Sequence, residues 1–234
     1  MDLSFDEFVL AAATADLGEE PAAREHADAV EFRMDMADDP LEALDRYDGD
    51  LPLVATNRPT WEGGEAAEEG RLAALRAAAE YDAVAAIDVE LAAITGEGAP
   101  ADAVDPEDGP AAVRHAHSCD ARVVVSTHDF EGTPPRDELA RLLHDASEHG
   151  DVAKLAVTAT DLDDALRVLG ATRAAASDGL TVATMAMGAA GSHTRAVAPV
   201  YGSRIGYAPV DPARATAPGQ YDLATLRGVV DALH

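Results

Sequence analysis

One lysine stands out among the residues that could do covalent chemistry. Lysine and arginine together number 17, and all but Lys154 are arginine. A guanidinium stays protonated in proteins, whereas a lysine amine held among apolar groups can attack a carbonyl carbon. Lys154 lies within the apolar run VAKLAV. We interpret it as a Schiff-base lysine, with the alternative that it stands by chance on a strand.

A histidine accompanies this lysine on the preceding apolar run. His128 follows the run VVVST, and the ordinary pKa of histidine near neutrality suits general acid–base catalysis. A structural histidine is an equal alternative when His128 is taken singly. If the two runs are adjacent strands, one substrate could touch both His128 and Lys154, so the pairing favours a catalytic role for each.

Acids and arginines recur at a spacing of two residues. Glu31 and Arg33 are separated by one residue, as are Asp88 and Glu90 in IDVEL. Because successive side chains of a strand point to opposite faces, each pair shares a face. The alternative for the first pair is an ion pair that only fills the fold. Buried acids need partners, and Arg33 and Arg58 are the candidates for Asp88 and Glu90.

Three loop patterns add further candidates. Arg58 precedes the acids and two glycines of residues 62–65, and glycine permits tight backbone geometry beside those acids. That pattern is common in loops and is weak alone. Arg195 could hold a carboxylate through two parallel hydrogen bonds. The proline and glycine of residues 215–220 predict a shaped loop that could close over a cavity.

Positioning these side chains requires a repeated βα fold, and eight repeats can be counted. We expect strands over residues 8–14, 29–33, 51–56, 84–90, 122–127, 152–157, 180–187 and 204–208. We expect helices to begin near residues 21, 40, 66, 110, 135, 161, 192 and 222. Eight repeats in 234 residues predict an α/β fold, a closed (β/α)8 TIM barrel, as a single domain over residues 1–234. An open doubly wound sheet is the alternative, disfavoured because no GxGxxG follows the first strand.

Two further segments carry expectations of their own. In the helix expected over residues 66–81, Leu72, Leu75 and Ala79 recur at helical spacing and should face the barrel. Residues 96–109 are rich in glycine, proline and acids and should form a surface loop. In a barrel the active site is built at the carboxyl ends of the strands, where His128 and the loop candidates all fall.

Composition excludes several classes of function. Asp and Glu number 44 against 17 Lys and Arg, and the net charge of -27 would repel nucleic acid and acidic membranes. Such acidity is typical of a surface adapted to high salt. The single Cys119 forms no internal disulfide, and no HExxH, P-loop or CxxC occurs, so we expect no metal and no cofactor. Without a long apolar run or a signal-like start, we expect a cytoplasmic enzyme.

Seven motifs occur in an order that matches a known family. They are EFRMD, R-x-x-x-EGGE, IDVEL, VSTHDF, VAKLAV, MAMGAAGSHTR and APGQ, and together they span nearly the whole chain. On these motifs the chain resembles the type I 3-dehydroquinate dehydratases. The resemblance implies a lyase of the shikimate pathway, acting in aromatic amino-acid biosynthesis. It implies dehydration of 3-dehydroquinate to 3-dehydroshikimate through a lysine Schiff base in a homodimer.

The resemblance also implies roles for single residues. Lys154 matches the Schiff-base lysine, His128 the residue that moves the proton, and Arg195 the carboxylate-binding arginine. The substrate-binding set implied is Glu31, Arg33, Arg58, Glu62, Arg195, Thr216 and Gln220. Thr194 and Thr216 stand where the family has serine, and Asn57 stands where it has an aromatic residue. The stretch over residues 207–220 is longer than in the family, which affects the placement of Thr216 and Gln220.

Two other functions fit parts of the pattern. A class I aldolase would share the barrel and the lysine but needs a phosphate site near the last two strands, and Gly202 and Gly206 lie on the wrong side of the eighth strand for one. A non-catalytic barrel that senses a quinate-like metabolite would leave the pairing of Lys154 with His128 unexplained. A turnover assay with 3-dehydroquinate separates all three.

Overall fold

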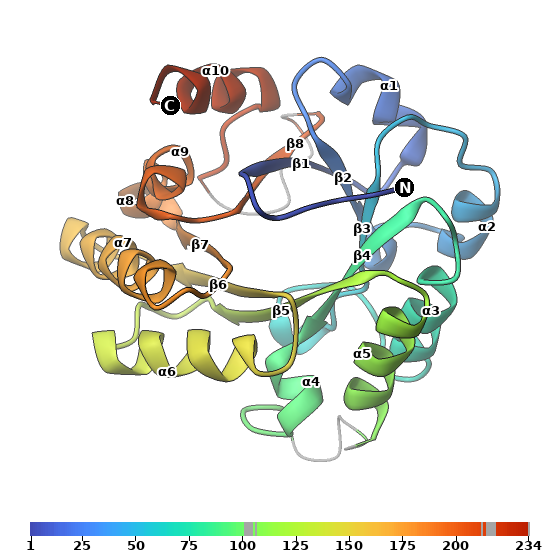
Figure 1. Cartoon of the computed structure of the whole chain (residues 1–234), viewed down its shortest axis with the longest axis horizontal. Helices are drawn as coiled ribbons and strands as arrows, with labels where there is room; N and C mark the ends of the chain where they lie inside the picture. Colours follow the sequence, from blue (N-terminus) through green and yellow to red (C-terminus); the bar gives the residue numbers. More distant parts are fainter. Residues whose placement is uncertain (101–104, 106, 212, 214–218, 234) are drawn as a thin grey trace.

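The computed structural model describes residues 1–100, 105, 107–211, 213 and 219–233. Eight parallel strands form one sheet in the order β7-β6-β5-β4-β3-β2-β1-β8, and a bridge between Val182 and Ser203 brings its two edges together (Figure 1). The predicted (β/α)8 barrel is therefore confirmed. The strands are β1 (Val9–Thr14), β2 (Ala29–Arg33), β3 (Leu53–Thr56), β4 (Val84–Glu90), β5 (Arg122–Asp129), β6 (Val152–Thr158), β7 (Val182–Met187) and β8 (Ile205–Pro209).

Helices surround this barrel, as Figure 1 shows. They are α1 (Glu20–Ala23), α2 (Pro40–Asp45), α3 (Arg71–Ala78), α4 (Leu91–Thr95), α5 (Asp108–Ser118), α6 (Arg136–Ser147), α7 (Leu162–Ser177), α8 (Gly188–Gly191), α9 (Thr194–Val197) and α10 (Leu223–Leu233). Short 3-10 turns are η1 (Leu17–Glu19), η2 (Met34–Met36), η3 (Thr60–Glu62) and η4 (Ala198–Tyr201). The side chain of Asp161 accepts a hydrogen bond from the backbone of Asp164 and so caps the longest of these helices, α7.

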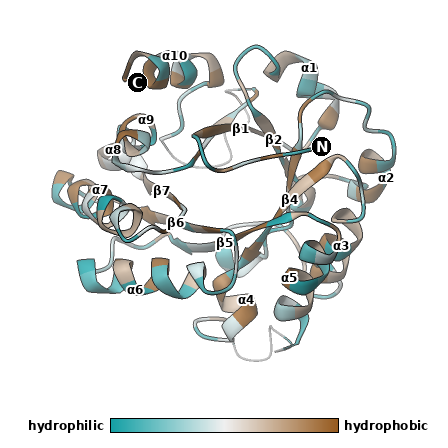
Figure 2. Ribbon diagram, viewed as in Figure 1, coloured by the Kyte–Doolittle hydropathy of each residue, from teal (hydrophilic) through white to brown (hydrophobic). Residues whose placement is uncertain are grey.

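The strands present two different faces. Outward residues such as Val30 and Phe32 pack with the helices in a large apolar cluster, whereas inward residues such as Ala29 form a second cluster inside the barrel. Figure 2 shows the apolar strands enclosed by helices of mixed polarity. The alternation confirms that Glu31 and Arg33 share the inner face. Leu3 and Phe5, which precede β1, are buried in the inner cluster and close the floor of the barrel.

The structure differs from the predicted helices and loops at four places. Helix α3 begins at Arg71 instead of residue 66, because Gly70 precedes it with a left-handed φ of 81°. Its residues Leu72 and Leu75 are buried as predicted, and so is Ala79 just beyond it. Helix α4 was not predicted. We expected a surface loop over residues 96–109. Its last two residues belong to α5, and residues 101–104 and 106 lie outside the described part of the chain. Around residue 192, two short helices, α8 and α9, replace one.

Candidate active site

A cavity of about 540 Å³, including its open mouth, lies among the carboxyl-terminal halves of the strands. Eight of the nine candidate residues line it, so strands far apart in sequence bring them together. They are Glu31, Arg33, Arg58, Glu62, His128, Lys154, Arg195 and Gln220. The ninth, Thr216, lies outside the described residues.

Lys154 points from β6 into this cavity and is only 4% exposed. Its Nζ atom donates a hydrogen bond of 2.8 Å to Oδ2 of Asp88 and lies 3.8 Å from Oε1 of Glu31. The ring centroid of Tyr207 lies 4.3 Å from the same nitrogen. We predicted that the Lys154 amine lies among apolar groups. That prediction was wrong at the nitrogen atom, which is paired with the buried carboxylate of Asp88.

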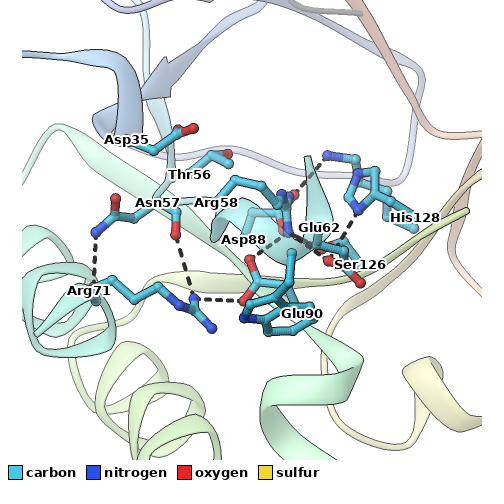
Figure 3. A network of polar contacts seen from close by, with 12 residues as sticks. Asp35, Thr56, Asn57, Arg58, Glu62, Arg71, Asp88, Glu90, Ser126 and His128 are labelled. Carbon is cyan, nitrogen blue, oxygen red and sulfur yellow. Dashed lines mark hydrogen bonds and ion pairs between the residues drawn. The ribbon is translucent and has the colours of Figure 1, made fainter. Parts of the chain in front are cut away.

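Arg58 forms the centre of a buried network, shown in Figure 3. Its guanidinium donates hydrogen bonds of 2.7 Å to each of Asp88, Glu90 and Ser126, and Ser126 donates one of 2.6 Å to Asp88. Burial alone would raise the pKa of Asp88, but the charges of Arg58 and Lys154 hold it well below its usual range. Asp88 therefore stays ionised and joins the network to the lysine.

A second arginine supports this network from behind. Arg71 donates 2.7 Å and 3.0 Å hydrogen bonds to Glu90 and Glu68, and its guanidinium lies over the ring of Trp61. The side chain of Asn57 donates to the carbonyl of Arg71 at 3.0 Å, as Figure 3 also shows. The sequence interpretation missed Arg71, although its place at the start of an apolar helix pattern was visible. Asn57, which stands where the family has an aromatic residue, thus forms a hydrogen bond to the residue that supports the network.

His128 lies near the end of β5, not in the loop after it as predicted. Ser126 pairs in register with Lys154, so His128 and the lysine are on adjacent strands as expected. Its Nδ1 atom lies 3.3 Å from Oε2 of Glu62. Burial lowers the pKa of His128 well below its ordinary value, and the charges of Arg58 and Lys154 lower it further. The imidazole is therefore neutral near pH 7 and able to accept a proton.

Glu62 is held by the glycines that follow it. Gly63 has a φ of +79°, and a side chain on Gly64 would meet the carbonyl oxygen of Arg58 at 2.1 Å. This close approach confirms that the two glycines serve backbone geometry. Burial raises the pKa of Glu62 to about 8, and the carboxylates of Glu90 and Asp88 add to the rise, although Arg58 opposes it. Glu62 therefore carries a proton over most of the neutral range.

The Glu31 and Arg33 side chains are paired separately. Glu31 accepts a hydrogen bond of 3.1 Å from Thr56, and Arg33 donates two, of 2.8 and 2.6 Å, to Asp35. Arg33 was predicted to be a partner of the acids on β4, which is wrong because η2 turns Asp35 back toward it. Arg58 alone of the two predicted arginines fills that role.

Arg195 enters the cavity from α9 and is 4% exposed. Its NH1 atom lies 3.5 Å from the sulfur of Met185, and burial lowers its pKa to about 10, although the charge of Glu31 opposes the shift. Thr194 fixes the start of α9: its hydroxyl donates to the Gly191 carbonyl at 2.7 Å and accepts from the backbone of β7. The threonine at this position therefore keeps the anchoring that a serine hydroxyl would give.

Neither a cluster of metal ligands nor a membrane-spanning helix occurs in the described part of the chain. Among those residues, no group of three or more histidine, cysteine or acidic side chains is arranged to hold a metal ion. None of the described helices has both the length and the apolar character that a membrane crossing needs.

A barrel that gathers a buried lysine, a neutral histidine and three arginines at its strand ends has the features of a TIM-barrel enzyme. The family model of the type I 3-dehydroquinase matches residues 10–234, and the chain belongs to that family. It is 60% identical over 232 residues to the 3-dehydroquinate dehydratase of Haloarcula marismortui, covering 99% of this chain and 98% of that protein. The enzyme of the same name from Halobacterium salinarum is 53% identical over 229 residues, covering 97% and 98%.

A solved structure gives the same result. The crystal structure of 3-dehydroquinate dehydratase from Geobacillus kaustophilus HTA426 has a TM-score of 0.81 at 26% identity, covering 97% of this chain and 91% of that one. The resemblance inferred from the seven motifs is confirmed. The two archaeal relatives come from halophiles, which accords with the acidic composition.

Proposed function

We propose that this chain dehydrates 3-dehydroquinate to 3-dehydroshikimate in the cytoplasm, with Lys154 as the Schiff-base nucleophile. Membership of the type I family supports the reaction, and the buried Lys154 amine at the cavity wall is the observation that carries the mechanism. No other lysine occurs in the chain, so a covalent imine on a side chain has one possible location.

Imine formation begins when the unprotonated Lys154 amine adds to the substrate carbonyl carbon. The carbon–oxygen bond then breaks and the oxygen leaves as water, with one proton from the nitrogen and one from solvent, while the nitrogen keeps one proton and the positive charge of an iminium. Asp88, 2.8 Å from Nζ, stays ionised and balances the iminium charge. The Asp88 hydrogen bonds to Arg58 and Ser126 fix its position during these steps.

Dehydration follows because the iminium acidifies the adjacent carbon–hydrogen bond. In this proposal Nδ1–H of His128 donates to Glu62, so that Nε2 accepts the carbon-bound proton and an enamine forms. His128 then returns the proton to the departing hydroxyl, a second water leaves, and the electron pair restores a conjugated iminium. Hydrolysis of that iminium releases the product and frees Lys154, so protons and water balance over the cycle.

The remaining candidates would bind the substrate without reacting. Arg195 would pair with its carboxylate, since a planar guanidinium matches that group with two parallel hydrogen bonds. The paired acids and arginines on β2, after β3 and on η3 would bind its hydroxyls. This set comprises Glu31, Arg33, Arg58 and Glu62, and Thr216 and Gln220 would contact the substrate from the closing loop.

Reduction by borohydride during turnover tests the covalent step. With 3-dehydroquinate present, borohydride should inactivate the enzyme by fixing one substrate-derived group on Lys154, because it reduces an iminium to a stable amine. Peptide mass mapping distinguishes this site from the terminal α-amine. The Lys154→Arg variant should lose both label and activity, since a guanidinium supplies no free amine. A label elsewhere, or an active Lys154→Arg enzyme, would refute the mechanism.

We further propose that the enzyme is a homodimer that buries the face formed by α7 and η4. Leu162 and Leu166 are 65% and 62% exposed on α7, and Val200 and Tyr201 are exposed on η4. Asp161, Asp163 and Asp164 lie at the start of α7, but between Asp164 and Asp211 the only acid is Asp178, although acids make up 44 of the 234 residues. In so acidic a chain, an apolar face with few acids is where two copies can meet with least repulsion.

Sedimentation equilibrium at high salt measures this association. Leu166→Glu should shift the protein toward monomer, because it places a charge in the contact and repeats it across the two-fold axis. Val229→Glu, at an exposed apolar site on α10, is the matched control and should remain dimeric. A monomeric parent protein, or a Leu166→Glu variant as dimeric as the control, would contradict this proposal.

A further inference from the structure

Tyr207 lines the cavity but has no part in the steps proposed above. On β8, Ile205 and Tyr207 join the cluster inside the barrel, whereas Ala208 packs outward beside Leu226 of α10. Tyr207 pairs in register with Ala11 of β1, a small residue that leaves room for the ring. The strand thus places one large aromatic ring inside the barrel at the level of the cavity.

The ring lies against the reacting nitrogen. Its centroid is 4.3 Å from Nζ of Lys154, well inside the roughly 6 Å range over which a ring face attracts a cation. On β7, the strand between them, Ala183 pairs in register with Lys154, and this small residue leaves room beside the amine. Both residues are 4% exposed, so little water screens the attraction.

We propose that the face of the Tyr207 ring stabilises the positive charge at Lys154 Nζ while the substrate is held as an iminium. The carboxylate of Asp88 lies 2.8 Å from the same nitrogen, so two different groups hold the cation. This inference rests on the proposed Schiff-base function and assigns it a further residue.

The charge at Nζ controls the rate because it makes the adjacent carbon–hydrogen bond acidic. When His128 takes that proton, the electron pair moves toward nitrogen and an enamine forms. A group that stabilises the iminium raises the fraction of substrate held in the reactive form. A desolvated cation over an aromatic ring is stabilised by about 2 kcal/mol, which corresponds to roughly 30-fold in the equilibrium between the bound ketone and the iminium.

The hydroxyl of Tyr207 does not explain the position of the residue. It is buried and makes no hydrogen bond within the described part of the chain. Burial raises the pKa of Tyr207 well above its ordinary value, and the charges of Glu31 and Asp88 raise it further. The phenol therefore stays neutral, and its ring, not an ionised oxygen, meets the nitrogen.

Two substitutions separate the ring from the hydroxyl. Tyr207→Leu should lower kcat by roughly 10- to 30-fold and reduce borohydride labelling of Lys154 during turnover. Tyr207→Phe keeps the face, so its kcat should fall by no more than about threefold. Its Tm should rise by about 2–4 °C, because a buried hydroxyl without a partner is removed. An equal loss of kcat in both variants would overturn the assignment to the ring, as would a fully active Tyr207→Leu enzyme.

Fluorinated phenylalanines at position 207 separate electrostatics from packing. One, two and three ring fluorines progressively weaken the negative face while the shape changes little. The logarithm of kcat should therefore fall stepwise with fluorination, with little change in KM. A flat series beside an impaired Tyr207→Leu enzyme would mean that the ring only fills space, and the inference would fail.

The wild-type control keeps this failure distinct from failure of the proposed function. If wild-type enzyme is not labelled at Lys154, the Schiff-base mechanism itself is wrong. If Lys154 is labelled in the wild type and the fluorinated series is flat, only the role of Tyr207 is wrong.

Discussion

Two walls of the same cavity are built in different ways. On the wall from β2 to β5, charged groups are paired with one another, as Arg58 is with Asp88 and Glu90. On the wall from β7 to α9 and β8, the cavity is lined by Met185, Met187, Tyr207 and Arg195. The first wall has its geometry fixed before substrate arrives, whereas the second offers apolar contact area and one guanidinium.

This difference suggests a division of labour. Groups already held by several hydrogen bonds need no reorganisation when charge moves, so the paired wall suits the chemical steps as well as the contacts to the substrate hydroxyls. Methionine sulfur and methyl groups adapt to a ring-shaped ligand, so the other wall suits binding of the substrate ring and carboxylate. Tyr207 is the exception, because it contacts the reacting nitrogen. Substitutions of His128 on the first wall and of Arg195 on the second should then change different kinetic constants.

The largest effect is expected at His128, on the paired wall. His128→Ala should lower kcat by roughly 10²- to 10⁴-fold, because the general acid–base group is lost. KM should change little, and borohydride should still label Lys154, since imine formation uses a different group. Steady-state kinetics and mass spectrometry check both points. Near-normal turnover would remove His128 from the mechanism and would break the proposed division.

A smaller effect, on KM instead of kcat, is expected at Arg195. Arg195→Ala should raise KM by about 10- to 100-fold, because a charge-assisted pair with the substrate carboxylate is worth about 1.5–3 kcal/mol. Arg195→Lys is the matched comparison, because it keeps the positive charge but loses the planar guanidinium. Its KM should lie between those of the wild type and Arg195→Ala. If Arg195→Ala instead lowers kcat at unchanged KM, the two walls do not differ as proposed.

An effect on stability instead of kinetics is expected at Glu62, where the dependence of stability on pH should change. Burial raises its pKa in the folded protein to about 8 from an ordinary 4.5. Its stabilising contribution is therefore complete below pH 4.5 and is lost as the pH rises through 8. Relative to Glu62→Gln, the unfolding free energy of the wild type should fall over this window, by at most about 1.4 kcal/mol per pH unit.

Denaturant titrations at several pH values measure this difference. The glutamine variant keeps the shape of a protonated carboxyl, so it isolates the titration of one group. Parallel stability curves for the two proteins would show that Glu62 is not held in its protonated form by the paired wall.

Much of this site follows from strand periodicity and from the rule for barrels. Alternation places Glu31 and Arg33 on the inner face, and chain order places His128 and Lys154 on neighbouring strands. Both inferences need only a residue's own strand and its neighbour. The position of each strand was likewise visible, because an apolar run with turns on both sides identifies it.

The contacts that cross the barrel could not be obtained in this way. Asp88 of β4 pairs with Lys154 of β6, and Tyr207 of β8 meets the same nitrogen, although neither strand is a neighbour of β6. Periodicity gives the face of a residue but not its height, which depends on the stagger of every strand in between. Arg33 was given the wrong partner for a related reason, since a short turn after β2 returned Asp35 to it.

The floor of the barrel has a consequence for the order in which the protein forms during synthesis. Leu3 and Phe5 are synthesised long before β8, yet the cluster that buries them includes Ile205 of that strand. Strand β1 also waits for β8, its partner in the sheet. Pairing of segments so distant in sequence is slow and costs loop-closure entropy. The segment from Leu3 to β1 therefore reaches its final packing only after β8 has been made.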